Sequence, residues 1–272
     1  MSDFLNDSVF QNIRDYIYAE SGIHFSDSNR SILESRLKER LRSLDGQSPA
    51  GYLDLLRRDK DETRYFLDAI TTNLTRFFRN QAHYDTFINY VIPDLVRRKT
   101  PTSNHKVRIW SAGCSTGEEP YTNAMVLSEH LPAGWGVEVV ASDLSLKSLM
   151  KAKEGFYPST RVSGIPETYL SKYFVEKDDG YLVSDAIKSL VKFDYHNLKF
   201  DPGLSDLDIV FCRNVLIYFD EAAQKNVIDH FWNAMAPHSF LFIGHSESLF
   251  GMNTKFEFIK TDWACLYGKN TG

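Results

Sequence analysis

Downstream of residue 105 the sequence alternates short apolar runs with segments of helical periodicity, and this alternation limits the possible folds more than any other feature. Strands that are connected through helices run parallel, so the pattern predicts an α/β domain with helices on both faces of a parallel sheet. The end of the chain differs, because residues 256–267 form two short apolar pieces around a Lys-Thr-Asp turn and predict a closing antiparallel hairpin. The expected buried strands are 107–111, 137–142, 191–195, 208–212 and 239–243.

The first hundred residues instead carry apolar side chains at three- and four-residue spacing, which is typical of helices. A polar stretch with a helix-stopping proline, residues 97–105, separates the two patterns. We therefore expect a helical domain over residues 1–80, a linker helix and connection over 81–104, and the α/β domain over 105–272. Within the latter, the irregular segment 158–190 is expected to form a small inserted antiparallel β-subdomain. The expected helices are 9–21, 29–44, 48–58, 61–71 and 82–98.

Charge and composition exclude several classes of function. The formal net charge of -5 argues against a general nucleic-acid binder that acts by neutralising phosphates. The three cysteines form no CxxC pair and the eight histidines form no ligand cluster, so neither a disulfide framework nor a metal site is expected. No run of 18 apolar residues and no signal-peptide pattern occurs, which favours a cytoplasmic protein without direct membrane insertion.

The turn after the first expected strand has the character of a cofactor-binding loop. Gly113 and Gly117 allow close backbone approach to a ligand at the carboxyl edge of the sheet, where such folds bind nucleotides. The loop has neither the Lys-Ser/Thr of a Walker A motif nor a GxGxxG motif, and Glu118 and Glu119 would repel a pyrophosphate. A cationic cofactor is therefore favoured over NAD or ATP, with a purely structural glycine turn as the alternative.

Polar residues follow other strands at the same edge. Asp143 ends the second strand, 26 residues after Gly117, where a carboxylate can accept hydrogen bonds from ribose hydroxyls; the alternative is a helix N-cap. Arg213, Asn214 and Tyr218 follow the fourth strand and are candidate site residues, although they could also form an ordinary loop network.

Two groups of polar residues in the helical region also require an explanation. Asn73, Thr75 and Arg79 interrupt an apolar stretch, so they need either a ligand or the simpler role of a capped helix end with an ion pair. The helix 29–44 has an inward stripe of leucines, and its flanks are basic. Those side chains are either a docking surface for an acidic partner or a solvated face paired with nearby glutamates. The four basic residues are Arg36, Lys38, Arg40 and Arg42.

Five segments together resemble the CheR family, the chemotaxis receptor glutamate O-methyltransferases that use S-adenosylmethionine. They are 71–79, 110–121, 141–143, 208–220 and 244–249, in the family's order. The resemblance implies a small helical domain followed by a Rossmann-like S-adenosylmethionine-dependent methyltransferase domain. The cofactor-binding residues that it implies, together with the glycine loop, are Asn73, Thr75, Arg79, Gly113, Glu118, Asp143, Asn197, Leu198, Arg213 and Asn214. It also implies that Arg79 and Tyr218 lie nearest the reacting centre.

The same resemblance implies methyl transfer to glutamate carboxylates on the cytoplasmic helical bundle of methyl-accepting receptors, with methyl esters and S-adenosylhomocysteine as products. A carboxylate with a pKa near 4.3 is already ionised at neutral pH, so no strong general base is needed. The basic helix would dock this bundle, and we expect a monomer without a metal. The short link from 174 to 182 argues against binding of a receptor tether peptide. A nicotinamide-dependent oxidoreductase and a non-catalytic adapter are the alternatives.

Overall fold

The computed structural model describes residues 4–44 and 47–270, and it begins with a bundle of four helices. Asn6, Ser48 and Asp59 cap three of these helices by accepting hydrogen bonds from backbone N–H groups of the first turn. The leucine stripe of the second helix points inward as expected, with Leu33, Leu37 and Leu41 buried. The helices are α1 (Asp7–Ser21), α2 (Arg30–Arg42), α3 (Pro49–Arg58) and α4 (Lys60–Ile70).

A seven-stranded sheet forms the centre of the second domain, in the order β6-β2-β1-β7-β8-β10-β9. The first five strands of this order pair in parallel, and the last two form the expected antiparallel hairpin. The sequence-based expectation of a mixed sheet built around a parallel core is thus confirmed. The strands are β1 (Lys106–Ala112), β2 (Gly136–Asp143), β6 (Val191–Tyr195), β7 (Leu207–Cys212), β8 (Met235–Ile243), β9 (Glu257–Lys260) and β10 (Cys265–Lys269).

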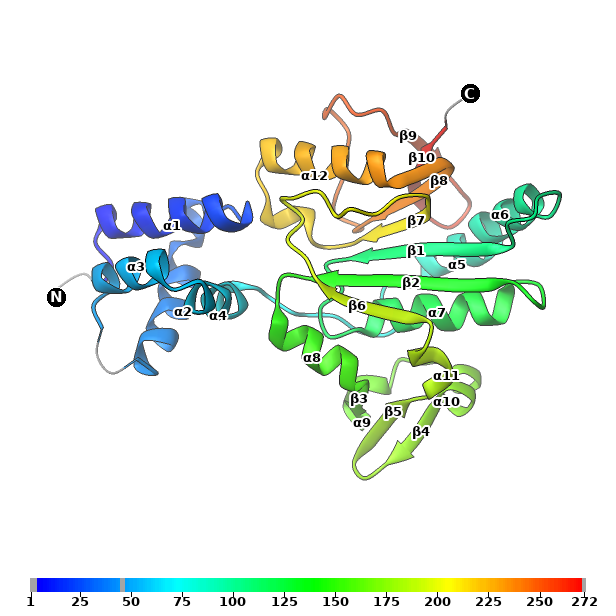
Figure 1. Ribbon diagram of the computed structural model, residues 1–272, viewed down its shortest axis with the longest axis horizontal. Coiled ribbons are helices and arrows are strands. Elements are labelled where there is room, and N and C mark those ends of the chain that lie inside the picture. Colours follow the sequence, from blue (N-terminus) through cyan, green and yellow to red (C-terminus); the bar gives the residue numbers. More distant parts are fainter. Residues whose placement is uncertain (1–3, 45–46, 271–272) are drawn as a thin grey trace.

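Helices cover both faces of this sheet (Figure 1). Helix α12 (Glu221–Ala234) buries Phe231 against Trp110 on one face. On the other face, α7 (Glu118–His130) packs beside a continuous helical segment made of α5 (Gln81–Thr86), a π-helical turn and α6 (Ile92–Lys99). Within residues 81–104, which the sequence assigned to a linker helix and connection, the apolar side chains of 84–96 therefore contribute to the core of the sheet domain.

The inserted subdomain contains a three-stranded antiparallel sheet, in the order β3-β5-β4. Its strands are β3 (Phe156–Pro158), β4 (Phe174–Lys177) and β5 (Gly180–Val183), and α8 (Leu146–Glu154) leads into it. The segment expected to form this β-subdomain is not all strand, because part of it lies in the helix α10 (Glu167–Tyr173). Tyr169 and Tyr173 are one helical turn apart there, so both lie on the same face of α10 and pack against the core.

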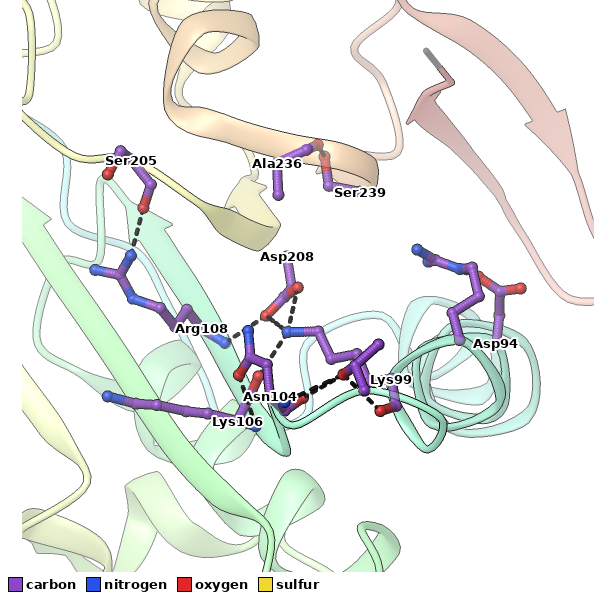
Figure 2. A network of polar contacts seen from close by, with 11 residues as sticks. Asp94, Lys99, Asn104, Lys106, Arg108, Ser205, Asp208, Ala236 and Ser239 are labelled. Carbon is purple, nitrogen blue, oxygen red and sulfur yellow. Dashed lines mark hydrogen bonds and ion pairs between the residues drawn. The ribbon is translucent and has the colours of Figure 1, made fainter. Parts of the chain in front are cut away.

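A buried ion pair fastens the segment 81–99 to the amino edge of the sheet (Figure 2). Lys99 Nζ lies 2.7 Å from Asp208 Oδ1 and 2.8 Å from Oδ2. The same carboxylate accepts a hydrogen bond from the backbone N–H of Arg108 at 2.9 Å, and Lys99 also donates to the carbonyl of Lys106. Because the two side chains are only 14% and 7% exposed, the pair links α6, β1 and β7 with little competition from water.

The helical domain contacts the sheet domain at the opposite edge, where the carboxyl ends of β1 and β2 point towards it (Figure 1). Ile23 and Phe219 form an isolated antiparallel bridge, and the N–H of His24 donates to the carbonyl of Tyr218 at 2.8 Å. Tyr18 donates its hydroxyl to Asp220 at 3.2 Å. These contacts place the helical domain directly above the edge where the sequence predicted a cofactor site.

Candidate cofactor and active site

A cleft lies between the carboxyl edge of the sheet and the helical domain, and it brings together residues that are far apart in the sequence. The loop 71–79 forms one wall, and the loops after β1, β2, β6 and β7 form the floor and the other walls. The predicted site residues that line it are Asn73, Thr75, Arg79, Gly113, Asp143, Asn197, Leu198, Arg213, Asn214 and Tyr218. Glu118 is the one predicted cofactor-binding residue that does not.

The glycine loop is held against its neighbours more tightly than a side chain would permit. Gly113 has a φ of 80°, and a Cβ atom there would lie 2.5 Å from Cγ2 of Val215. The N–H groups of Gly113 and Cys114 both donate to the carbonyl of Ser142, at 2.8 and 2.9 Å. The loop after β1 is therefore packed between the loops after β2 and β7, with its backbone facing the cleft.

Asp143 organises the floor of the cleft. Its Oδ2 accepts from the N–H of Ser115 at 2.7 Å, and its Oδ1 accepts from the N–H of Ser145 at 2.8 Å. Burial raises the pKa of the carboxyl, while these backbone donors oppose that rise. The N-cap of α8 is Ser145, whose hydroxyl accepts from the N–H of Ser148. The cap reading of Asp143 is therefore wrong, and the carboxylate lines the cleft instead.

We expect Asp143→Ala to weaken S-adenosylmethionine binding by about 1.5 to 3 kcal/mol, the scale of a charge-assisted hydrogen bond. Isothermal titration calorimetry measures this change directly. Ser145→Ala is the matched control, because it removes the cap of α8 at a cost of about 1 kcal/mol in stability and should leave affinity unchanged. Equal affinities for Asp143→Ala and the unmodified protein would contradict the assignment.

The structure corrects the sequence-based assignment of Glu118 to the cofactor site. The Glu118 side chain is fully buried and pairs with Arg161 of the inserted subdomain, and it also accepts from the hydroxyl of Thr116 at 2.7 Å. It is Glu119 that lines the cleft. Successive residues of a helix point about 100° apart, so only the orientation of α7 decides which of the two faces the ligand.

Glu119 lies in a buried network of opposite charges. Its Oε1 accepts from the hydroxyl of Ser111 at 2.7 Å, and its Oε2 lies 3.2 Å from Nη1 of Arg213. Burial raises the pKa of the Glu119 carboxyl, and the Arg213 guanidinium opposes that rise. Arg213 also donates to the carbonyl of Arg79, which joins the loop after β7 to the loop 71–79.

Replacing each of the two neighbouring glutamates by glutamine, in separate variants, distinguishes their roles. Glu119→Gln should weaken S-adenosylmethionine binding about tenfold, because it removes a charge-assisted acceptor from the cleft wall. Glu118→Gln should change the affinity less than about threefold, since its partner is Arg161. Titration of both variants tests this, and a larger loss in Glu118→Gln would return the cofactor contact to Glu118.

Several predicted residues use part of their hydrogen-bonding capacity within the protein. Arg79 donates from Nη1 to the carbonyl of Leu74 at 2.9 Å, which leaves further guanidinium donors for a ligand. Asn197 donates to the carbonyl of Glu20 at 2.8 Å and accepts from the N–H of Lys199 at 3.0 Å. The Asn197 amide thus holds the loop after β6 against α1.

Sequence reasoning missed the part of the cleft that the helical domain supplies. Ile23 and Phe25 line it from the segment between α1 and α2, and Ile32 lines it from α2. Ser115 and Glu119 line the cleft from the sheet domain. The helical-domain residues carry no sequence signal of their own, because each looks like an ordinary apolar residue until the two domains meet. Their presence makes the wall opposite the sheet apolar.

The basic side chains of helix α2 fall into two groups, one paired inside the helical domain and the other on its outer surface. Arg40 pairs with Glu62 of α4, with Nη2 and Oε2 at 2.5 Å, and the hydroxyl of Tyr52 donates to the same carboxylate. The assignment of Arg40 to docking is corrected, because its charge is committed to the core of the helical domain. Lys38 pairs with Glu34 at 2.6 Å and Arg36 approaches Glu39 at 3.8 Å, as the solvated-face alternative anticipated.

Fold and cleft together define a class. A parallel sheet with a glycine loop after its first strand and a carboxylate at the tip of its second is a Rossmann-like enzyme domain that binds an adenosine-containing cofactor. Residues 73–265 match the family described as "CheR methyltransferase, SAM binding domain", and residues 8–71 match "CheR methyltransferase, all-alpha domain". The chain therefore belongs to the CheR methyltransferase family and is an S-adenosylmethionine-dependent chemotaxis protein methyltransferase.

Relatives of similar length support this placement. "Chemotaxis protein methyltransferase 2" of Vibrio cholerae is 35% identical over 93% of this chain and 89% of its own. "Chemotaxis protein methyltransferase" of Borreliella burgdorferi is 36% identical over 89% and 88%, and that of Escherichia coli is 35% identical over 93% and 88%.

The donor set of the cleft fits S-adenosylmethionine. Its wall presents two carboxylates, Glu119 and Asp143, together with the guanidinium groups of Arg79 and Arg213. A ligand with an ammonium group, a carboxylate and ribose hydroxyls can find a partner of the required type for each of these groups there.

Within residues 4–44 and 47–270, no cluster of three or more His, Cys, Asp or Glu side chains has the arrangement of a metal site. No helix in those ranges is long and apolar enough to cross a membrane.

Proposed function

We propose that this protein transfers the methyl group of S-adenosylmethionine to glutamate side chains of methyl-accepting chemotaxis receptors, and that the resulting methyl esters serve sensory adaptation. The observation that carries the proposal is the convergence of Arg79, Asn214 and Tyr218 on one cleft, beside Asp143 and the glycine loop. This arrangement offers hydrogen-bond donors to a carboxylate and includes no obligatory general base, which suits a substrate that is already ionised.

S-Adenosylmethionine supplies, when bound, a methyl group on a positively charged sulfur. Asp143 would accept hydrogen bonds from the ribose hydroxyls of the cofactor, and Glu119 would face its ammonium group. Leu198 would pack against its adenine ring. Arg213 donates hydrogen bonds to Glu119 and to the carbonyl of Arg79, so it would hold these two cleft residues in position. Asn73 and Thr75 line the wall that carries Arg79.

The remaining residues act on the geometry of the incoming carboxylate. Arg79 would orient it through its guanidinium donors, and Tyr218 would donate a hydrogen bond or exclude water. An Arg79 contact that paired too strongly would reduce the nucleophilicity of the carboxylate, so its role is orientation. The apolar wall formed by Ile23 and Phe25 would help to exclude water from the cleft, which would strengthen these polar contacts.

The proposed partner is the cytoplasmic helical bundle of the receptor, and we propose that the enzyme acts in the cytoplasm as a monomer. Arg36, Lys38 and Arg42 remain on the outward flanks of α2, and they would attract an acidic bundle through a field that salt screens within about 8 to 10 Å.

The direct experiment is incubation of the enzyme with receptor cytoplasmic fragments and methyl-labelled S-adenosylmethionine, followed by mass spectrometry of the modified peptides. We expect base-labile label on glutamate side chains, and inhibition by S-adenosylhomocysteine. Label on another residue type, or none with any receptor of the source organism, would contradict the proposal.

Charge reversal on α2 tests the docking surface. Arg36→Glu combined with Arg42→Glu should raise the KM for receptor several-fold and flatten its salt dependence, without changing cofactor affinity. The control is Arg97→Glu combined with Lys225→Glu, which makes the same charge change on α6 and α12. Parallel salt curves for both double variants would assign the α2 charges to the solvated face of the helix.

A further inference from the structure

Glu247 lies in the loop after β8, in the motif 244–249, and no role in the reaction has so far been assigned to it. Its carboxylate accepts three backbone hydrogen bonds: from Asn214 at 2.9 Å and Gly244 at 2.5 Å to Oε2, and from Ile217 at 3.2 Å to Oε1. Two of these three donors belong to the loop after β7, which carries Asn214 and Tyr218 into the cleft.

That loop has a backbone conformation that needs external support. Asn214 has a φ of 61°, in the left-handed region that residues other than glycine seldom adopt. The 3₁₀ turn Leu216–Tyr218 follows immediately, and Glu247 accepts from the N–H of Ile217 within this turn. A carboxylate that binds an N–H group on each side of Val215 therefore holds both the strained residue and the start of the turn.

The carboxylate itself is held in place by its own loop. Gly244 leaves no space for a side chain, because a Cβ atom there would lie 2.6 Å from Glu247 Oε2 and 2.7 Å from the nitrogen of Asn214. Leu249 is buried in the core on the α12 side of the sheet, and its N–H donates to the hydroxyl of Tyr267 at 3.0 Å. Gly244 and Leu249 thus fix the loop on both sides of Glu247.

The supported loop contacts both the glycine loop and the helical domain. Val215 packs against Gly113 of the glycine loop, and Tyr218 accepts from the N–H of His24 in the helical domain. A shift of the loop would therefore move the Tyr218 ring relative to the reacting centre. We infer that Glu247 is a positioning residue, which acts on methyl transfer by holding the segment 214–218 through its backbone amides. This inference rests on the proposed role of Tyr218.

The test uses Glu247→Gln, with Glu257→Gln as the matched control. Glutamine keeps the shape of the side chain but replaces one acceptor oxygen by an NH₂ group, which cannot accept from a backbone N–H. Glu257 is an exposed carboxylate on β9 that pairs with Asn270, so its variant should behave as the unmodified protein does.

We expect Glu247→Gln to lower kcat at least tenfold and to change the dissociation constant of S-adenosylmethionine less than about threefold. In the Tyr218→Phe background the same substitution should cost much less, because the two residues act through one geometry. The inference would be overturned if the effects of Glu247→Gln and Tyr218→Phe on kcat simply multiplied in the double variant. It would also be overturned if Glu247→Gln lowered kcat no more than Glu257→Gln does.

Hydrogen exchange provides a readout that needs no methyl acceptor. Mass spectrometry of the peptide that contains residues 213–218 should show faster exchange, at least tenfold, in Glu247→Gln than in Glu257→Gln. Unchanged exchange would overturn the positioning role by itself. If exchange rises as expected but the unmodified enzyme methylates no receptor, it is the proposed function that fails, and not the structural role of Glu247.

Discussion

Replacing Arg79 by alanine is expected to lower methyl transfer by about two to three orders of magnitude, the scale of losing a group that aligns reactants. The reason is that Arg79 is anchored to Leu74 through one donor and presents the rest of its guanidinium to the cleft. Cofactor affinity should fall much less than kcat, because Asp143 and Glu119 remain. Single-turnover kinetics with saturating S-adenosylmethionine separates the two effects.

Tyr218→Phe is the companion variant, since it removes only the hydroxyl and keeps the ring against the core of the helical domain. It should reduce turnover while leaving the affinity for S-adenosylmethionine unchanged. If Arg79→Ala lost cofactor affinity and kcat/KM by the same factor, Arg79 would be a cofactor-binding residue without a separate orienting role. If Tyr218→Phe turned over normally, only the ring of Tyr218 would matter.

The second large effect concerns stability. Lys99→Met should lower the free energy of unfolding by about 3 to 5 kcal/mol, because it leaves the Asp208 carboxylate buried without its cationic partner. Asp208 would keep the N–H of Arg108 as a donor, but that single neutral donor does not replace the Lys99 ammonium group (Figure 2). Urea denaturation measures the loss.

The double variant Lys99→Met with Asp208→Leu is the control for this prediction. Replacing both charges by apolar groups should recover most of the lost stability, because a buried ion pair is costly mainly when one partner is missing. Lys106→Met, at a more exposed ion pair with Glu138, should cost less than about 1 kcal/mol. If Lys99→Met also lowered the free energy of unfolding by less than about 1 kcal/mol, water would have to reach the Asp208 carboxylate.

Much of the fold follows from features that the sequence shows locally. The period of the apolar residues separates the four N-terminal helices from the strands of the sheet, because burial on one helical face and burial within a parallel sheet leave different patterns. The secondary structure of the inserted subdomain was harder to predict from the sequence. Its aromatic residues, such as Tyr169 and Tyr173, can pack from a helix as well as from a strand, and the pattern there is short.

The sequence by itself also determined the chemistry of the sheet edge. Gly113, Asp143 and Arg213 each follow an expected strand, and parallel strands bring their carboxyl ends to one edge whatever the details of packing. Asn73 and Arg79 interrupt an apolar stretch and so needed a ligand or a cap, but only the family resemblance assigned them to the cofactor site, because they reach the cleft from a loop of the preceding segment.

Only the tertiary structure decided which way individual side chains point. Glu118 and Glu119 are chemically identical neighbours, and the orientation of α7 turns one towards Arg161 and the other towards Arg213. Arg40 pairs with Glu62, 22 residues further along the chain, so its charge is used inside the helical domain. Glu247 reaches the loop after β7 across 33 residues. Periodicity and local motifs describe the course of the backbone, whereas such pairings depend on distances between segments that meet only in the folded chain.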